Sequence, residues 1–387
     1  MGRLNKRALI RQLQKAGVSS RADLARSLGM SQPTAGKIVD ELLALKVLEE
    51  VETPEANGHS PAAGRMGRPG RRLRLNRSEA RFLGIQLGVN ETRLAELPIG
   101  VTDADDWQVS FRIPAAHPSP ATAWERQLRM AARKLRSRTF LGALLSVPGV
   151  VDESANRILF SPNMHWSENA DLAAVIRKIW NTPVLLVQEE RALALGHQAN
   201  HPDQEDFLLV DFGDGVGGAI IVGGKLLAQP LPISGEIGHT PVLGNGRKCG
   251  CGATGCMETL ISTRGLMESF RASRSGKKNS WAELRADIER NGMRPWLAQA
   301  LDAAAVAIAG ALNVLGLRRV VITGSLTTLP PDVLAHLSGA IRNGAMWARF
   351  GTVECTGAPR QRAAGLVAVG IDRLVVPDND PQAFVPG

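Results

Sequence analysis

The feature that most constrains this chain is a cluster of cysteines in the stretch GEIGHTPVLGNGRKCGCGATGCMETL, residues 235–260. Cys249, Cys251 and Cys256 follow a C-x-C-x4-C spacing, and His239 precedes the first of them by ten residues. Three thiolates and one imidazole complete a tetrahedral zinc site and leave no open position for water. The sequence therefore predicts a structural Zn²⁺ in a reducing compartment, which holds the loop in one shape and takes no part in catalysis.

Two carboxylates flank the predicted zinc ligands. Glu236 lies three residues before His239, and Glu258 lies two residues after Cys256. A zinc ion that fixes the loop also fixes both carboxylates, and paired acceptors suit sugar hydroxyls, which donate hydrogen bonds without carrying charge. The alternative is three unligated thiols beside two solvated surface acids. Cys355 stands alone and is expected to be a small core residue.

Length and composition indicate a globular chain of two or three domains. The sequence has 387 residues, of which 44% are hydrophobic and 21% charged. The basic start MGRLNKRALIRQLQKAG lacks the uninterrupted apolar core of a signal peptide, and no apolar run reaches the roughly 20 residues of a membrane helix. We therefore expect a cytoplasmic protein without a membrane partner.

The positive charge is concentrated at the N-terminal end. The formal net charge is +9, and residues 1–82 hold 16 Lys and Arg against 8 Asp and Glu. The remaining residues hold 30 Lys and Arg against 29 Asp and Glu, a surplus of one. This asymmetry indicates a polyanionic partner for the first fifth of the chain alone.

The first fifty residues predict a helix-turn-helix. Ser20 and Asp23 form a capping-box pattern before a second helix, and Ser31 is placed to cap a third. In this motif the N-terminal end of the last helix enters the major groove of DNA. The polar residues expected there are Gln32, Thr34 and Lys37. The alternative is a small helical bundle with a solvated face.

The next segment resembles the wing of a winged helix. LEEVETP and RRLRLN predict two strands, joined by ANGHSPAAGRMGRPGR. Arg65, Arg68 and Arg71 flank glycines and a proline there, so the backbone can lie close to a minor groove, which favours arginine. We expect phosphate contacts to supply most of the affinity and to make it strongly salt-dependent.

Beyond residue 81, strands alternate with helices, which predicts an α/β fold. The strand-like runs are FLGIQLGV, FLGALLSVPGVVD, PVLLVQEE, DFLLVDFG, GAIIVGGKLLA and RRVVITGS, and the helix-like runs are WERQLRMAARKL, LAAVIRKIW, RALALGHQA and PWLAQALDAAAVAIAGALNVLG. The glycine-rich turns DFGDGVGGA and ITGSL end two of the strands, where such folds bind ligands.

Five motifs in order, SVPGVVD, SPNMHW, GDGVGGAIIVGGKLL, GEIGHTPV and CGCGATGCME, resemble the ROK family of sugar kinases and sugar-responsive repressors. The resemblance covers roughly residues 81–373, and the N-terminal winged helix is similar to the repressor branch. It implies a two-lobed fold of the actin and hexokinase type with sugar in the cleft. It also implies that the sugar-binding residues are Gly149, Gln188, Glu189, Glu236, His239 and Glu258.

The predicted domains follow from this resemblance. Residues 1–77 form a winged helix-turn-helix with an arginine-rich wing and linker, residues 78–375 form a two-lobed ROK sugar-binding domain, and residues 376–387 form a C-terminal tail.

The motifs depart from the kinase pattern at both phosphate turns. Kinases of this family typically carry D-x-G-G-T after the first strand, whereas residues 86–90 read QLGVN, with an amide at Gln86 and no second glycine at Val89. The second turn is typically G-T-G, and here Asp214 replaces the threonine. A carboxylate about 4 Å from a phosphate at surface-like dielectric costs on the order of 4 kcal/mol.

The third kinase requirement is a base, usually the aspartate of an N-D pair, and Gln188 and Glu189 occupy that register. Because both phosphate turns are altered, we expect a sugar pocket without phosphoryl transfer and therefore no enzyme activity. Glu189 is a catalytic candidate only if the chain is a kinase.

The sequence as a whole predicts a sugar-responsive transcriptional regulator, a repressor that binds operator DNA and a sugar or sugar phosphate. A homodimer, or a dimer of dimers, would read a pseudo-palindrome. One alternative is an active ATP-dependent sugar kinase that carries a DNA-binding domain. Another is a regulator that responds to a protein and keeps the pocket as a vestige.

Overall fold

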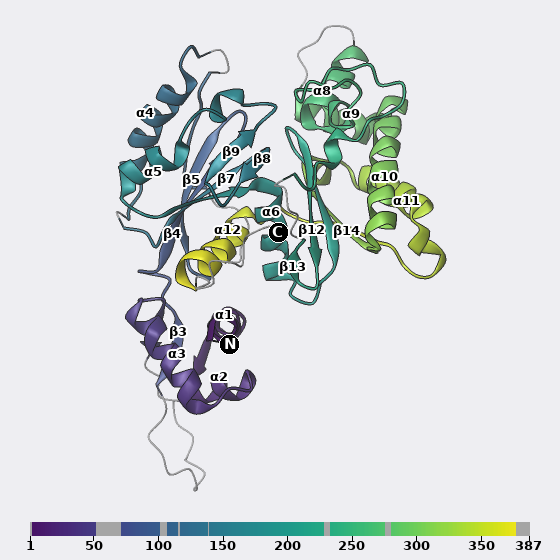
Figure 1. Ribbon diagram of the computed structural model, residues 1–387. Helices are drawn as coiled ribbons and strands as arrows, with labels where there is room; N and C mark the ends of the chain where they lie inside the picture. The colour runs from purple at the N-terminus through teal and green to yellow at the C-terminus, as the bar shows by residue number, and fades with distance from the viewer. Residues whose placement is uncertain are drawn as a thin grey trace.

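The computed structural model describes residues 2–51, 71–100, 107–114, 117–137, 139–227, 233–274 and 280–376, with only the backbone of residues 2–4. It has three parts, which we call the head (residues 2–75), the first lobe and the second lobe (Figure 1). The head lies below the first lobe, and the two lobes stand side by side above it. The predicted arginine-rich loop lies outside the described residues, apart from Arg71.

The head is a winged helix-turn-helix, as the sequence predicts. Ser20 Oγ accepts a hydrogen bond from the Asp23 backbone N–H at 3.1 Å, and Ser31 Oγ accepts one from that of Thr34 at 3.3 Å. Both predicted caps therefore start their helices. The antiparallel strands of the wing pair in the order β1-β3-β2. The elements are α1 (Gly2–Ala16), β1 (Val18–Ser20), α2 (Arg21–Ser27), α3 (Gln32–Ala44), β2 (Leu48–Val51) and β3 (Arg72–Leu75).

The two lobes are built on five-stranded sheets with the same topology. In the first lobe the order is β10-β7-β4-β5-β6, and in the second it is β13-β12-β11-β14-β15. In each sheet the strand that comes first in the chain pairs antiparallel with the next strand and parallel with the fourth. This repetition confirms the predicted two-lobed α/β fold.

The strands of the first sheet are β4 (Arg81–Leu87), β5 (Thr92–Pro98), β6 (Val109–Phe111), β7 (Ala143–Val147) and β10 (Val184–Gln188). Those of the second are β11 (Phe207–Phe212), β12 (Val216–Val222), β13 (Lys225–Leu226), β14 (Arg319–Gly324) and β15 (Glu354–Gly357). A hairpin of β8 (Val150–Asp152) and β9 (Arg157–Phe160) extends the first lobe.

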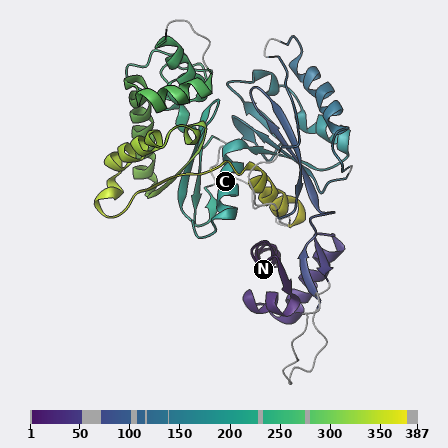
Figure 2. The ribbon, with the colours of Figure 1, turned by 180° about the vertical axis from the view of Figure 1, so that it is seen from behind.

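Two helices, α6 (Glu189–Asn200) and α12 (Arg362–Gly370), lie between the two sheets (Figures 1 and 2). Residues of α12 pack on the first sheet, whereas Leu193 and Ala194 of α6 pack on the second. The helices meet backbone to backbone, because a Cβ at Gly196 would lie 1.8 Å from the carbonyl oxygen of Gln361 and one at Gly365 would lie 1.7 Å from that of Ala192. Any side chain at either glycine would push the lobes apart.

The other helices of the lobes pack outside the sheets. The first sheet carries α4 (Pro120–Ala132) and α5 (Leu172–Trp180). The second carries α10 (Pro295–Leu315) and α11 (Pro331–Gly344), and the same hydrophobic cluster continues into α7 (Glu258–Ile261), α8 (Thr263–Ala272) and α9 (Trp281–Asn291). Residues of β11 alternate between the two faces, so both faces are buried and the strand reads as the continuous apolar run seen in the sequence.

Among the described residues, one helix, α10, is long and apolar enough to cross a membrane, with a mean hydropathy of 1.5. Gln299 and Asp302 interrupt its apolar run, which is why the sequence predicts no membrane segment there. Its Leu301 and Ile308 are fully buried in the core of the second lobe, so α10 has the position of a core helix.

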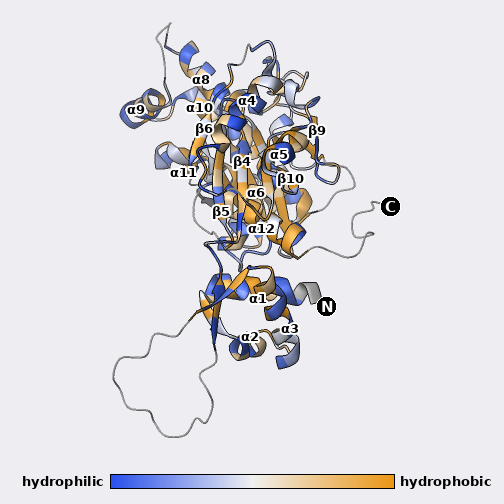
Figure 3. Ribbon diagram, turned by 90° about the vertical axis from the view of Figure 1, so that its left-hand side faces the viewer, coloured by the Kyte–Doolittle hydropathy of each residue, from blue (hydrophilic) through white to orange (hydrophobic). Residues whose placement is uncertain are grey.

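The head packs directly on the first lobe. One buried hydrophobic cluster contains Leu9 and Leu13 of α1 together with Val369 of α12 and Ile371 just beyond it. Arg7 of α1 forms an ion pair with Asp372 at the end of the same segment. In Figure 3, as in Figure 1, α1 lies below α12. The predicted domain boundary after residue 77 falls between β3 and β4, and it stays a prediction.

Candidate functional site

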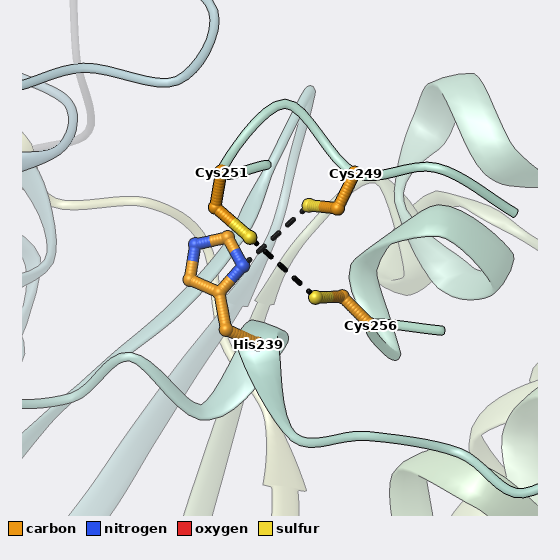
Figure 4. A group of neighbouring side chains, drawn as sticks. All are labelled: His239, Cys249, Cys251 and Cys256. Atoms are coloured by element: carbon orange, nitrogen blue, oxygen red, sulfur yellow. Dashed lines mark hydrogen bonds between the residues drawn. The ribbon is translucent and has the colours of Figure 1, made fainter. Parts of the chain in front are cut away.

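The Cys and His side chains predicted from the sequence converge at one point in the second lobe. One ligand atom from each of His239, Cys249, Cys251 and Cys256 lies within 4.8 Å of all the others. His239 Nδ1 is 3.6 Å from Cys249 Sγ, and the Sγ atoms of Cys251 and Cys256 are 3.6 Å apart (Figure 4). This spacing around a common centre is what a small tetrahedral ion requires.

The loop that carries the cysteines is held in place by its backbone. Gly252 and Gly255 have φ of +93° and +90°, where a side chain would be strained. Asn245 donates to the carbonyl of Cys256 at 3.1 Å, and Arg247 donates to the carbonyl of Thr259 at 2.7 Å. These bonds anchor the loop to the start of α7.

The donor set fits a metal ion. Burial, and the thiols of Cys251 and Cys249 beside it, raise the pKa of Cys256 to about 12. Three thiolates this close together therefore need a cation to neutralise them. Three sulfurs and one imidazole nitrogen are the ligands that Zn²⁺ prefers in closed structural sites.

His239 joins this cluster to a cleft between the lobes. Its Nδ1 faces Cys249, whereas its Nε2 lies 3.6 Å from Glu236 Oε2. Both His239 and Glu236 line the cleft. Burial raises the pKa of the Glu236 carboxyl. An ion held at Nδ1 would fix the tautomer and aim Nε2–H at the cleft.

Glu258 reaches the same cleft from the first position of α7. It is 4% exposed, and its Oε2 accepts a hydrogen bond from the Val216 backbone N–H at 3.0 Å. A Cβ at Gly215 would lie 2.9 Å from this oxygen, so the second phosphate turn packs closely over the carboxylate. The metal loop and the turn after β11 thus position Glu258 together.

The first turn of α6 brings two more carboxylates into the cleft, Glu189 and Glu190. Glu189 forms an ion pair with Arg362, the fully buried first residue of α12, and lies 3.5 Å from Gln86 Nε2. The Glu190 side chain packs over Gly217 of β12, where an added Cβ would lie 2.6 Å from its Oε1.

The two altered phosphate turns contact each other across the cleft. Asn90 Nδ2, after β4, lies 2.9 Å from Asp214 Oδ2, after β11. In the same region Asp211 accepts from Arg360 Nε and Nη2, both at 2.7 Å. Burial would raise the pKa of Asp211, but Arg360 outweighs it and holds that pKa below its usual range.

Arg360 fills the space between two glycine turns of the second sheet. A Cβ at Gly213 would lie 2.5 Å from its guanidinium, and one at Gly324 would lie 2.9 Å from it. Those turns, DFGDG and ITGSL, are the strand ends where a ligand phosphate was expected. The guanidinium of Arg360, paired with Asp211, lies against both turns.

The other predicted sugar residues lie as follows. Gly149 lines the cleft with φ of +94°, and a Cβ there would lie 2.3 Å from the carbonyl oxygen of Phe160. Gln188 is buried, and its backbone N–H donates to Glu153 at 3.2 Å. It ends β10 and directly precedes α6, and it is not among the residues that line the cleft.

The predicted DNA-contacting residues of the head are accessible where they are described. Gln32, Thr34 and Lys37 are exposed at the N-terminal end of α3. Arg71 is exposed and pairs with Glu50 at 2.5 Å. Arg65 and Arg68 lie outside the described residues.

Three cleft residues were not singled out from the sequence, namely Glu190, Asp211 and Arg360. The partners of Asp211 are 112 and 149 positions away along the chain, so no local pattern reveals them. Glu190 had a visible signal, because it follows Glu189 directly at the end of a predicted strand.

These features define a class of protein, a two-lobed sugar-kinase-type fold that carries a winged helix-turn-helix head and a Cys and His cluster beside its cleft. The chain belongs to the ROK family, because the family model described as "ROK family" matches residues 84–362.

Similar sequences include both repressors and kinases. A xylose repressor of Caldicellulosiruptor bescii is 24% identical over 284 residues, which cover 69% of this chain and 66% of that protein. The xylose repressor of Bacillus subtilis is 26% identical over 73% of this chain and 71% of its own length. An N-acetylmannosamine kinase of Escherichia coli is 29% identical over 56% of this chain and 72% of its own.

Solved structures agree on the fold. A ROK family transcriptional regulator, described as a homolog of the E. coli MLC protein, superposes with a TM-score of 0.75 at 20% identity and covers 96% of each chain. A ROK family glucokinase from Streptomyces griseus, in complex with glucose and AMPPNP, gives a TM-score of 0.57 at 20% identity. It covers 75% of this chain and 98% of its own.

Proposed function

We propose that the protein is a sugar-responsive transcriptional repressor that has no kinase activity. The head binds operator DNA through α3 and the wing, and the cleft binds a sugar effector. The observation that carries the proposal is the coexistence of a helix-turn-helix with a three-stranded wing sheet and a cleft whose phosphate turns are joined by Asn90 and Asp214. The xylose repressors among the relatives support the same reading.

The geometry of the cleft argues against phosphoryl transfer. Asp214 sets a negative charge in the second phosphate turn, and Arg360 already pairs with Asp211 there. The residue in the register of the catalytic base, Glu189, is held by the buried Arg362. A carboxylate engaged in this ion pair would have to leave Arg362 before it could contact a sugar hydroxyl.

We infer that Zn²⁺ occupies the cluster of His239, Cys249, Cys251 and Cys256 and that its role is structural. Four protein ligands satisfy the ion, so it activates no water. When bound, it supplies a fixed positive charge that holds the loop. The protein residues contact the ligand: His239 directs one nitrogen into the cleft, and Glu236 and Glu258 present hydrogen-bond acceptors.

Helix α12 supplies a physical connection between the cleft and the head. Its first residue, Arg362, pairs with Glu189 in the cleft, and Asp372, two residues beyond its end, pairs with Arg7 of the head. A sugar that hydrogen-bonds to Glu189 competes with Arg362 for the same carboxylate. We propose that this competition shifts α12 and, through Arg7, the orientation of the head.

We also propose that the functional unit is a homodimer, or a dimer of dimers, on a pseudo-palindromic operator. A helix-turn-helix reads a short half-site, and two heads at helical-turn spacing supply the affinity of a specific repressor. Ligand then acts by favouring one spacing of the heads over the other.

The test begins with DNA selected by the full-length protein from a random duplex pool. Fluorescence anisotropy at several salt concentrations then measures affinity for the selected site. Lys37→Ala is expected to weaken binding and lower the salt slope by about one, the value for one lost phosphate contact. Lys178→Ala, an exposed lysine on α5 of the first lobe, is the matched control and should change neither.

Adding sugars to the same assay tests whether a sugar changes the affinity for DNA. Xylose, glucose and N-acetylmannosamine are the first effectors to try, because the relatives' names include the first and the third. A protein that selects no sequence from the pool would contradict the proposal. So would sequence-specific binding that no sugar changes, which would favour a regulator controlled by another protein.

A further inference from the structure

We propose that the effector of this cleft is an amino sugar with a free ammonium group and that Glu190 is the residue that recognises the ammonium. This inference rests on the function proposed above and narrows its ligand class. It makes Glu190 a specificity-determining residue that contacts the ligand directly.

The charges that line the cleft are strongly unbalanced. Six carboxylates line it, from Glu189, Glu190, Asp211, Asp214, Glu236 and Glu258. Among the lining residues that the structure describes, the one arginine is Arg360, and both of its bonding nitrogens contact Asp211. The cleft therefore has an excess of negative charge that a ligand, rather than the protein, is placed to balance.

Several of these carboxylates already have partners. Glu189 pairs with Arg362, Asp214 accepts from Asn90, and Glu258 accepts from the backbone of Val216. Glu236 lies beside His239. Within the described part of the chain, the Glu190 carboxyl differs from all of them, because no hydrogen bond or ion pair joins it to another side chain.

The Glu190 side chain lies against Gly217, a position without a side chain. A Cβ at Gly217 of β12 would lie 2.6 Å from Glu190 Oε1 and 2.8 Å from its Cγ. Any residue larger than glycine there would push the carboxyl out of position. The half-buried Glu190 carboxyl accepts a hydrogen bond from its own backbone N–H, but no cation among the described residues neutralises it, which is an expected feature of a binding site.

The surroundings of Glu190 oppose its ionisation in the absence of a ligand. Burial, the neighbouring Glu189, and the facing Glu236 and Asp211 raise its pKa well above the usual range. An ammonium group beside Glu190 reverses this effect, because an opposite charge favours the ionised carboxylate. Binding of an amine is thus coupled to loss of the Glu190 proton at any pH where the carboxyl of the free protein is protonated.

The same charges exclude a phosphate ester. A sugar phosphate carries about two negative charges at neutral pH and is recognised by free arginine, lysine or backbone N–H groups. Arg360 and Arg362 are already paired with Asp211 and Glu189. We therefore expect phosphorylation of the ligand to abolish its binding.

Thermal denaturation and calorimetry of the full-length protein provide the test. The probes are glucosamine, mannosamine and galactosamine, each beside its hydroxyl counterpart, its N-acetyl derivative and its 6-phosphate. We expect an amino sugar to bind about tenfold or more tightly than its neutral counterparts, as one close charge pair provides. Calorimetry in buffers of different ionisation enthalpy should show proton release.

Glu190→Gln keeps the shape of the site and removes its charge, so it should lose both the amine preference and the proton release. Glu289→Gln, on the exposed face of α9, is the control and should keep both. Equal or tighter binding of a neutral sugar would overturn this inference, but it would not contradict the proposal that the effector is a sugar. A wild-type amine preference that persists in Glu190→Gln would also overturn it. Binding of no sugar at all would overturn the sugar-effector part of the proposed function as well.

Discussion

The side-chain amide of Asn90 donates a hydrogen bond to the carboxylate of Asp214 across the cleft, with 2.9 Å between Nδ2 and Oδ2. Asn90 belongs to the first lobe and Asp214 to the second, 124 positions later in the chain. Each replaces a residue of a phosphate turn in the family's kinase pattern. The two replacements therefore contact each other directly across the cleft.

The first prediction is that the wild-type protein binds no Mg²⁺·ATP. The Asp214 carboxylate repels phosphate, and Arg360 is engaged by Asp211. Titration calorimetry with Mg²⁺·AMPPNP, with and without a hexose, should show no saturable heat. Saturable binding, together with hexose phosphorylation that Glu189→Gln abolishes, would establish the kinase alternative.

The second prediction concerns the pair between Arg362 and Glu189. Arg362 is 2% exposed, so Arg362→Met leaves a buried carboxylate without its counter-charge. Breaking a buried pair in this way typically costs about 3–5 kcal/mol. Urea denaturation should show this loss in the free energy of unfolding.

A matched control for this substitution is Arg285→Met on α9. Arg285 and Glu289 form an exposed pair one helical turn apart, 2.9 Å between Nε and Oε1. Such a pair contributes about 0.3–0.5 kcal/mol, so the control should change stability little. Equal losses for both variants would mean that Arg362 does not support Glu189 as described.

Local features of the fold could be predicted from the sequence, because the residues that form them are near each other in the chain. Ser20 and Ser31 cap helices through residues three positions later, and the three cysteines lie within eight positions. The cysteine spacing and His239 predict the metal cluster for the same reason. Helices α7, α8, α9, α11 and α12 were not predicted, and neither were strands β1, β5, β6, β9 and β15.

The cleft could be predicted only in part, because its ion pairs join residues that are far apart in the sequence. Arg360 meets Asp211 across 149 positions, and Arg362 meets Glu189 across 173. Neither arginine lies in a recognisable motif, and the pairing depends on α6 and α12 packing together. Gln188 is the last residue of β10 and is buried, whereas Glu189 begins α6 and lines the cleft, a difference that depends on where the strand ends and the helix begins.

The third prediction is that the purified protein contains about one zinc per chain, bound by four protein ligands. Cys251→Ser removes one ligand, so metal analysis should show a lower zinc content and the melting temperature should fall. Cys355→Ser is the control, because Cys355 lies on β15 outside the cluster. Wild-type protein without zinc after purification in metal-containing buffer would contradict this prediction.

The fourth prediction tests the connection between α12 and the head. Arg7→Asp should break the pair with Asp372, and its direct effect on stability should be about 1 kcal/mol or less because the pair is partly exposed. The ratio of DNA affinities with and without sugar should move toward one, while sugar affinity stays unchanged. The double variant Arg7→Asp, Asp372→Arg restores opposite charges and should recover part of the ratio. Unchanged regulation in the single variant would exclude this pair from the coupling.

The fifth prediction is a pH dependence caused by Glu190. Its ordinary pKa is 4.5, and in the folded protein burial and the carboxylates of Glu189, Glu236 and Asp211 raise it well above that value. Above pH 4.5 the unfolded chain loses this proton while the folded chain keeps it, so stability falls as pH rises toward the raised pKa. Below pH 4.5 both states are protonated and the effect disappears.

Glu190→Gln removes this titration, so its stability relative to the wild type should increase as pH rises, by about 1.4 kcal/mol for each unit of pKa shift. The measurement is the free energy of unfolding by urea at intervals from pH 4 to pH 9 for both proteins. Taking the difference between them cancels groups that titrate equally in both, the zinc ligands included. Glu289→Gln, at an exposed position on α9, is the matched control. A flat difference for Glu190→Gln would mean that folding leaves the pKa of the Glu190 carboxyl unchanged, which would contradict this prediction.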